Sequence, residues 1–93
     1  MAEKRTLRLL YRNDDWMYAL YEEDGTGELI LHSLCGENAA HYDVFLQLAP
    51  EDRRYYLDHP YALNYLAASV CSTDKKFAHQ LIDIDVGVTR FVE

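Results

Sequence analysis

Apolar side chains recur at every second position through the first half of this chain, and that period restricts the segment to β-structure. Leu7, Leu9 and Tyr11 share one parity near the start, as expected for a strand whose two faces meet different surroundings. A similar alternation, rich in aromatic side chains, resumes after the polar turn that begins at Asn13. We therefore expect strands over residues 6–12, 16–23 and 28–35.

Two further features complete the predicted sheet. Asp24-Gly25 stands between two apolar runs, and this dipeptide favours a tight hairpin turn with positive φ. Residues 41–48 alternate again and predict a fourth strand. A helix is the alternative for that segment, because Val44, Phe45 and Leu48 also satisfy helical spacing.

The character of the sequence changes at Pro50, where the apolar period becomes helical. A proline followed by Glu51 and Asp52 is typical of a helix start, since the acids lie near the positive end of the helix dipole. This helix should end by His59, because Pro60 disfavours helical geometry in the residue before it. Pro60 then opens a second helix, whose apolar stripe is Leu63, Leu66, Ala67 and Val70.

The C-terminal part predicts one more helix and one more strand. Thr73 and Asp74 are good caps for a short third helix that carries Phe77 and Leu81 one turn apart. Apolar residues then alternate with polar ones, and this predicts a fifth strand over residues 82–91.

These elements define an α+β fold in one domain, residues 1–93, since a chain of 93 residues has room for no more. We expect an antiparallel sheet of four to five strands, in the order ββββ-α-α-β, with two to three C-terminal helices packed on one face. Such a sheet normally alternates apolar and polar sides, yet here both faces carry large apolar groups. Either the helices and the last strand cover both faces, or one face is a binding or dimerisation surface.

The acidic balance of the chain limits its partners. Sixteen acidic and nine basic side chains give a net charge of −7, which repels phosphate backbones and argues against nucleic-acid binding. The same field attracts a basic protein and speeds its encounter. No apolar run of about 18 residues predicts a membrane span, so we expect no membrane partner.

The two cysteines and the N-terminal residues together predict a cytoplasmic protein. The start, Met1 to Arg5, leads directly into the first strand and lacks the apolar run of a signal peptide. Cys35 and Cys71 are the only cysteines. Without an export signal, two cysteines are expected to be reduced and buried and not to form a disulfide.

No residues have the spacing of an established active site. Cys35 lies near His32, His41 and Asp43 in the sequence, and a thiol nucleophile needs such a base and an orienting group. Alternation nevertheless places Cys35 and His32 on opposite faces of their strand. The four histidines and two cysteines form no paired zinc-binding motif, so we expect neither a metal nor another cofactor.

One resemblance emerges from these segments. The run from Leu29 to Gly36, the run from Tyr42 to Leu48, and Pro50-Glu51-Asp52 leading into helices resemble small acidic bacterial proteins. Some of these are immunity proteins of polymorphic or contact-dependent toxin systems. The resemblance covers about half of the chain and is one of pattern. It implies a cytoplasmic protein that binds and blocks a cognate toxin domain, and it transfers no functional residue.

We therefore expect a non-enzymatic protein-binding module, most simply an immunity or inhibitor protein for a basic toxin or enzyme domain. A homodimeric structural or regulatory domain is the first alternative, and a Cys35-dependent enzyme or small-ligand binder is the second. Aromatic side chains supply binding energy in interfaces, and exposed acids steer a basic partner. The expected anchors are Trp16, Tyr18 and Phe45, and the expected steering acids are Asp14, Asp15, Glu22, Glu23, Asp24, Asp83 and Asp85.

Overall fold

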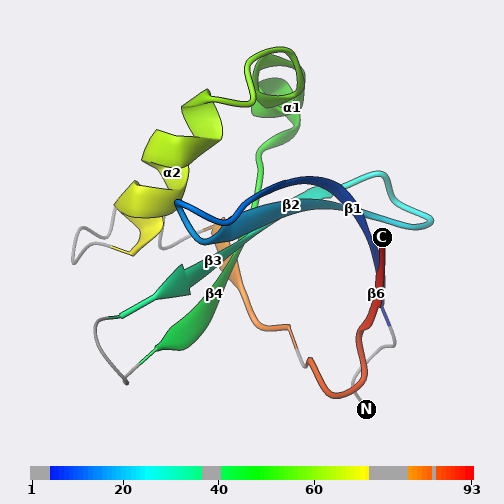
Figure 1. Ribbon diagram of the computed structural model, residues 1–93. Helices are drawn as coiled ribbons and strands as arrows, with labels where there is room; N and C mark the ends of the chain where they lie inside the picture. The colour runs from blue at the N-terminus through cyan, green and yellow to red at the C-terminus, as the bar shows by residue number, and fades with distance from the viewer. Residues whose placement is uncertain (1–4, 37–40, 72–79, 85) are drawn as a thin grey trace.

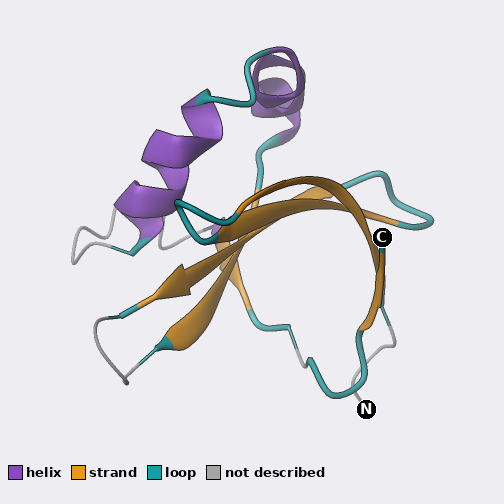
Figure 2. Ribbon diagram, in the orientation of Figure 1, coloured by secondary structure: helices purple, strands orange, loops and turns teal. Residues whose placement is uncertain are grey.

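Six strands and two helices form the described parts of the chain, which are residues 5–36, 41–71, 80–84 and 86–93 of a computed structural model (Figure 1). The helices follow the first four strands and lie together on one side of the sheet (Figure 2). The α+β class is therefore confirmed. The elements are β1 Thr6–Asn13, β2 Tyr18–Glu23, β3 Leu29–Cys35, β4 Tyr42–Gln47, α1 Pro50–Asp58, α2 Ala62–Val70, β5 Leu81–Ile82 and β6 Arg90–Val92.

The sheet has the order β5-β4-β3-β2-β1-β6. Neighbours from β5 to β1 run antiparallel, whereas β6 runs parallel to β1. The prediction of a purely antiparallel sheet of four to five strands is wrong in these details. The segment predicted as one strand over 82–91 is interrupted by a turn at residues 86–88, so its two ends pair with opposite edges of the sheet.

Two further predictions, the fourth strand and the hairpin turn at Gly25, are confirmed. Residues 42–47 form a strand paired with β3, as the preferred interpretation required. Gly25 has a φ of 91° in the β2–β3 turn, which confirms the expected positive φ. Thr73, Asp74 and Phe77 of the predicted third helix lie outside the described residues, whereas Leu81, which was predicted to belong to that helix, lies in β5.

The face of the sheet that carries the helices is closed by leucines. Leu20, Leu31 and Leu46 are paired across three neighbouring strands and point to this side. Leu63 and Leu66 of α2 pack against them, and all five side chains are buried. Each buried leucine contributes about 2 kcal/mol of transfer free energy, so the stripe predicted on α2 fixes that helix to the sheet.

The opposite face, which we call the second face, is covered in part by the C-terminal segment. Ile30 and Phe45 are buried there together with Leu7. Ile82 and Ile84 pack against them, and the segment that carries these residues continues to β6 along the far side of the curved sheet from the helices (Figure 1). The chain therefore covers much of both apolar faces itself, which favours the first of the two explanations for them.

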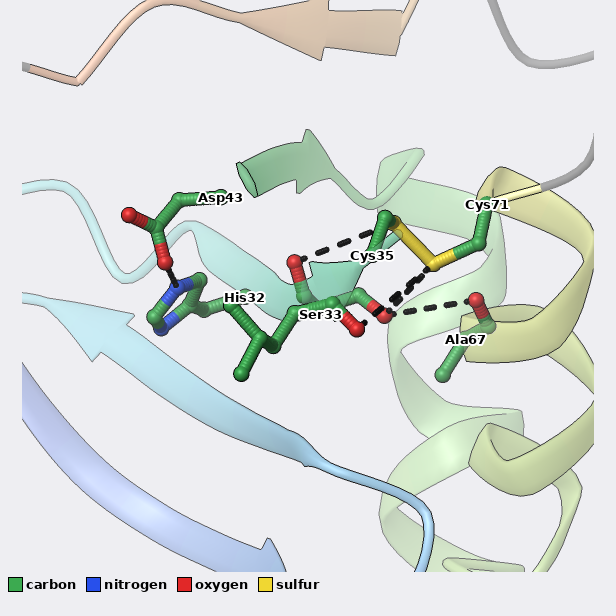
Figure 3. Close-up of a disulfide and its surroundings, with 7 residues drawn as sticks. His32, Ser33, Cys35, Asp43, Ala67 and Cys71 are labelled. Atoms are coloured by element: carbon green, nitrogen blue, oxygen red, sulfur yellow. Dashed lines mark hydrogen bonds and ion pairs between the residues drawn. A yellow bond between two sulfur atoms is a disulfide. The ribbon is translucent and has the colours of Figure 1, made fainter. Parts of the chain in front are cut away.

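A disulfide joins the end of β3 to the end of α2. Cys35 and Cys71 are bonded, with their Cα atoms 5.2 Å apart. Figure 3 shows this bond on the helix side of β3, where the Ser33 hydroxyl also donates to the carbonyl of Ala67 at 3.3 Å. The expectation of two reduced thiols is wrong. The positions of the two cysteines in the sequence do not reveal that the C-terminal end of α2 lies beside the end of β3.

Candidate functional site

Only one of the three predicted anchors is on the surface. Tyr18 is 3% exposed and Phe45 is 5% exposed, because α2 covers the first and the C-terminal segment covers the second. Trp16 is 46% exposed. Tyr18 and Phe45 are therefore core residues, and the expectation that they contact a partner is wrong for this structure.

Tyr18 instead connects the sheet to α2. Its hydroxyl donates a hydrogen bond to Oδ1 of Asn64 at 2.6 Å. Burial raises the pKa of the Tyr18 phenol to about 12, and the neighbouring Tyr11 phenol adds to the shift. The phenol is thus held neutral, as a hydrogen-bond donor within the fold.

Trp16 is presented by a constrained turn between β1 and β2. Its backbone N–H donates to the side-chain oxygen of Asn13 at 3.1 Å. The next residue, Met17, has a φ of 56°, a left-handed conformation that is unfavourable for a long side chain. The N–H of Leu34 donates to the Met17 carbonyl at 3.0 Å and helps to hold this conformation. The backbone that carries Trp16 is therefore held by hydrogen bonds on both sides of the residue.

The Trp16 ring belongs to a larger aromatic surface formed with the helices. It contacts Tyr65 of α2, with ring centroids 6.2 Å apart. Tyr65 and Tyr61, one helical turn apart, are 70% and 62% exposed. His59 links Tyr61 to α1, since it lies 5.9 Å from the Tyr61 ring and stacks on Tyr55 at 4.8 Å. We call Tyr55, His59, Tyr61, Tyr65 and Trp16 the aromatic row.

Four members of the aromatic row were not predicted as site residues. The sequence carried a signal for them, because Tyr55 and His59, like Tyr61 and Tyr65, stand four residues apart. Such pairs share one side of a helix. On α2 that side is opposite the buried stripe, so its tyrosines are left in solvent.

The predicted steering acids are dispersed, and several are already paired. Glu23 forms an ion pair with Arg5 at 3.3 Å, and Asp24 forms one with Arg8 at 3.5 Å. Glu22 is half-buried within β2, and Asp83 is exposed in the segment after β5. Asp85 lies outside the described residues.

Asp14 and Asp15 are the predicted acids that accompany the aromatic row. Both are exposed in the turn that carries Trp16. Asp14 pairs with Arg12 at 3.2 Å, but both side chains are open to solvent, and such pairs stabilise little. The carboxylates therefore remain able to interact with a cationic partner.

The thiol–histidine arrangement considered from the sequence is not formed. Cys35 is engaged in the disulfide. His32 lies on the other face of β3, as alternation predicted, and donates to Asp43 at 2.7 Å (Figure 3). Its ring also stacks on Phe45, with ring centroids 4.4 Å apart. His32 is therefore oriented by Asp43, but Cys35 lies on the opposite face of the strand and is not within its reach as a thiol.

Within the described ranges, no three His, Cys, Asp or Glu side chains gather as metal ligands would. In the same part of the chain, neither helix has the length and apolarity needed to cross a bilayer. No protein-family model, curated protein or solved structure matches this chain. Its function must therefore be argued from its own surface.

Proposed function

We propose that this chain is a non-enzymatic protein-binding module that contacts a basic protein through the aromatic row. The observation that carries the proposal is the contact between Trp16 and Tyr65, whose ring centroids are 6.2 Å apart and which remain 46% and 70% exposed. A fold that buries Tyr18 and Phe45 has the capacity to hide aromatic rings. Leaving these two outside costs it apolar burial, and a partner that covers them recovers that free energy.

The aromatic row has the composition of an interface core. Tyrosine and tryptophan supply large contact areas with few rotatable bonds, so ordering them on binding costs little entropy. Contacts within the row restrict them further, since His59 stacks on Tyr55 and its ring nitrogen lies 3.1 Å from the Tyr55 carbonyl oxygen. Rings positioned before binding increase affinity because less freedom is lost.

Charge gives the expected chemistry of the partner. The net charge of the chain is −7, and Asp14 and Asp15 stand in the same turn as Trp16. Acids at the border of an aromatic contact raise the association rate of a basic protein more than its final affinity. The resemblance to immunity proteins leads to the finer proposal that this partner is a toxin or enzyme domain which the chain blocks by covering it.

The disulfide bears on where this binding takes place. Disulfides persist in oxidising compartments and are rare in the cytosol. The Cys35–Cys71 bond therefore supports a site of action in an oxidising compartment and opposes the cytoplasmic location expected from the sequence. Trapping free thiols in intact cells before lysis tests this directly, because a cytosolic protein would be labelled at both cysteines.

Comparative capture tests the binding proposal. The wild-type chain, a Trp16→Ser/Tyr65→Ser variant and a Tyr42→Ser control are immobilised and exposed to lysate of the source organism. Tyr42 is 54% exposed on β4 and is not part of the aromatic row. We expect a basic protein to be retained by the wild type and the control and lost with the double variant. Equal retention by all three would contradict the proposal, and a stable dimer by light scattering would identify a second copy as the occupant.

A further inference from the structure

A hollow on the second face of the sheet lies where the C-terminal segment does not cover it. Its volume is about 340 Å³. Ala19 is one of its lining residues, and this small residue is paired with Arg12 of β1 on one side and with His32 of β3 on the other. The small side chain of Ala19, between the longer side chains of Arg12 and His32, leaves this space open.

The surroundings of Ala19 are mainly apolar. Met17 and Leu34 line the hollow together with the Tyr21 ring. His32 presents a flat ring there, held against Phe45 by stacking at 4.4 Å. A ligand that fits this space therefore has an apolar stem or a flat body that can lie against rings.

The charges around the hollow favour a cation. Arg12 lines the hollow, and it is already paired with two carboxylates, Asp14 at 3.2 Å and Glu93 at 3.5 Å. Asp43 adds a third carboxylate, which accepts a hydrogen bond from His32. Two carboxylates thus pair with the Arg12 guanidinium and a third is bound to His32, so the local excess is negative like the chain as a whole.

We propose that this hollow binds a planar cation on an apolar stem, namely an arginine side chain of the partner. Guanidinium groups stack on aromatic rings and pair with carboxylates in a fixed fork geometry. The turn between β1 and β2 joins this hollow to the aromatic row, because Trp16 contacts Tyr65 while Met17 lines the hollow. This inference rests on the proposed function in one respect, namely that the cation belongs to a protein partner.

Three small molecules of equal shape test the charge requirement without an identified partner. Benzamidine is cationic, benzamide neutral and benzoate anionic, and each is titrated into the ¹⁵N-labelled, oxidised wild-type chain. We expect benzamidine to cause saturable shifts of the backbone amides of Ala19, His32 and Leu34. Benzamide should bind more weakly, and benzoate should produce no saturable shift.

Two matched pairs of variants locate the binding. Ala19→Leu fills the hollow and should abolish the benzamidine shifts, whereas Ala68→Leu makes the same change at an exposed position of α2 and should not. Asp43→Asn should weaken binding about two- to fivefold, the effect of one solvent-exposed charge. Asp58→Asn removes an equal charge from α1 and should leave binding unchanged.

The outcomes separate this inference from the proposed function. Absence of saturable benzamidine shifts, or equal binding of benzoate, would overturn the assignment of the hollow. Loss of partner capture by Trp16→Ser/Tyr65→Ser would still support the aromatic row in that case. Conversely, benzamidine binding that Ala19→Leu abolishes would stand even if the capture experiment failed.

Discussion

The hydroxyl of Tyr18 and the side-chain oxygen of Asn64, 2.6 Å apart, join the start of β2 to the middle of α2. Asn13 donates to the same oxygen at 3.3 Å. One amide oxygen thus accepts hydrogen bonds from two residues that flank the turn carrying Trp16. The position of the turn relative to the helix depends on this polar junction as well as on leucine packing.

Replacing Tyr18 with phenylalanine should remove the junction while retaining the ring. We expect the free energy of unfolding to fall by about 1–2 kcal/mol, the usual effect of losing a largely buried hydrogen bond, as measured by urea denaturation. Tyr61→Phe serves as the control, since its hydroxyl is exposed and its loss should change stability by less than about 0.5 kcal/mol. Equal effects of the two changes would show that the Tyr18 bond does not stabilise the fold.

Alkaline pH should destabilise the protein through the same phenol. The pKa of Tyr18 is raised from 10.0 to about 12, chiefly by burial. The unfolded chain therefore loses this proton at lower pH than the folded chain, so the stabilisation is complete below pH 10 and is lost as pH rises towards 12. Burial also raises the pKa of Tyr21 and Tyr56, so Tyr18→Phe should reduce the alkaline loss of stability without abolishing it. An unchanged slope in the variant would contradict the assignment.

Opening the disulfide should cost the fold a large part of its stability. A crosslink between residues 36 positions apart restricts the unfolded chain by about 4 kcal/mol in the loop-entropy model. Urea midpoints with and without dithiothreitol measure the difference. The Cys35→Ser/Cys71→Ser variant should be as unstable as the reduced wild type and should not respond to the reductant. Two reactive thiols in the non-reduced native protein would disprove the bond.

Phe45 and Trp16 should behave in opposite ways when each is replaced by alanine. Phe45 is enclosed by Ile30 and Ile82, so its removal should lower the free energy of unfolding by about 3–5 kcal/mol. Trp16→Ala removes the side chain of a residue that is 46% exposed and should change stability by less than about 1 kcal/mol. The same change should eliminate capture of the basic partner. A large loss of stability in Trp16→Ala would assign that ring to the core.

Glycine should be tolerated at Met17 better than at an ordinary surface position. The φ of Met17 is 56°, where a side chain adds about 1 kcal/mol of strain or more. Met17→Gly should therefore leave thermal stability unchanged or raise it slightly. Leu57→Gly, at an exposed position inside α1, should lower stability by about 1 kcal/mol. Similar losses in both variants would show that the turn is not strained.

The alternation of the sequence predicted the first four strands because each pairs with its neighbour in the chain. Local periods reveal which residues share a strand face, and the opposite placement of His32 and Cys35 followed from that alone. The same periods do not reveal what covers a face. Alternation alone therefore does not distinguish Tyr18 and Phe45 from surface residues, although α2 and the C-terminal segment enclose them.

Non-local pairings account for the other differences. The alternation over residues 82–91 does not reveal that Ile82 pairs with Phe45 at one edge of the sheet while Phe91 pairs with Leu7 at the other. The disulfide depends in the same way on where α2 returns to β3. Part of the aromatic row could be predicted, since Tyr61 and Tyr65 stand four residues apart in the sequence. The contact of Trp16 with Tyr65 could not be predicted, because it depends on the β1–β2 turn lying beside α2.

The parallel pairing of β6 with β1 has a consequence for synthesis of the protein. β1 cannot pair with β6 until residues 90–92 have left the ribosome. In the same way, β4 cannot pair with β5 until residues 81–82 have emerged. Throughout that interval both margins of the nascent sheet offer unpaired backbone groups to other chains. Newly made molecules are therefore most vulnerable to aggregation until this segment has left the ribosome and paired, and any protection from chaperones matters most in that interval.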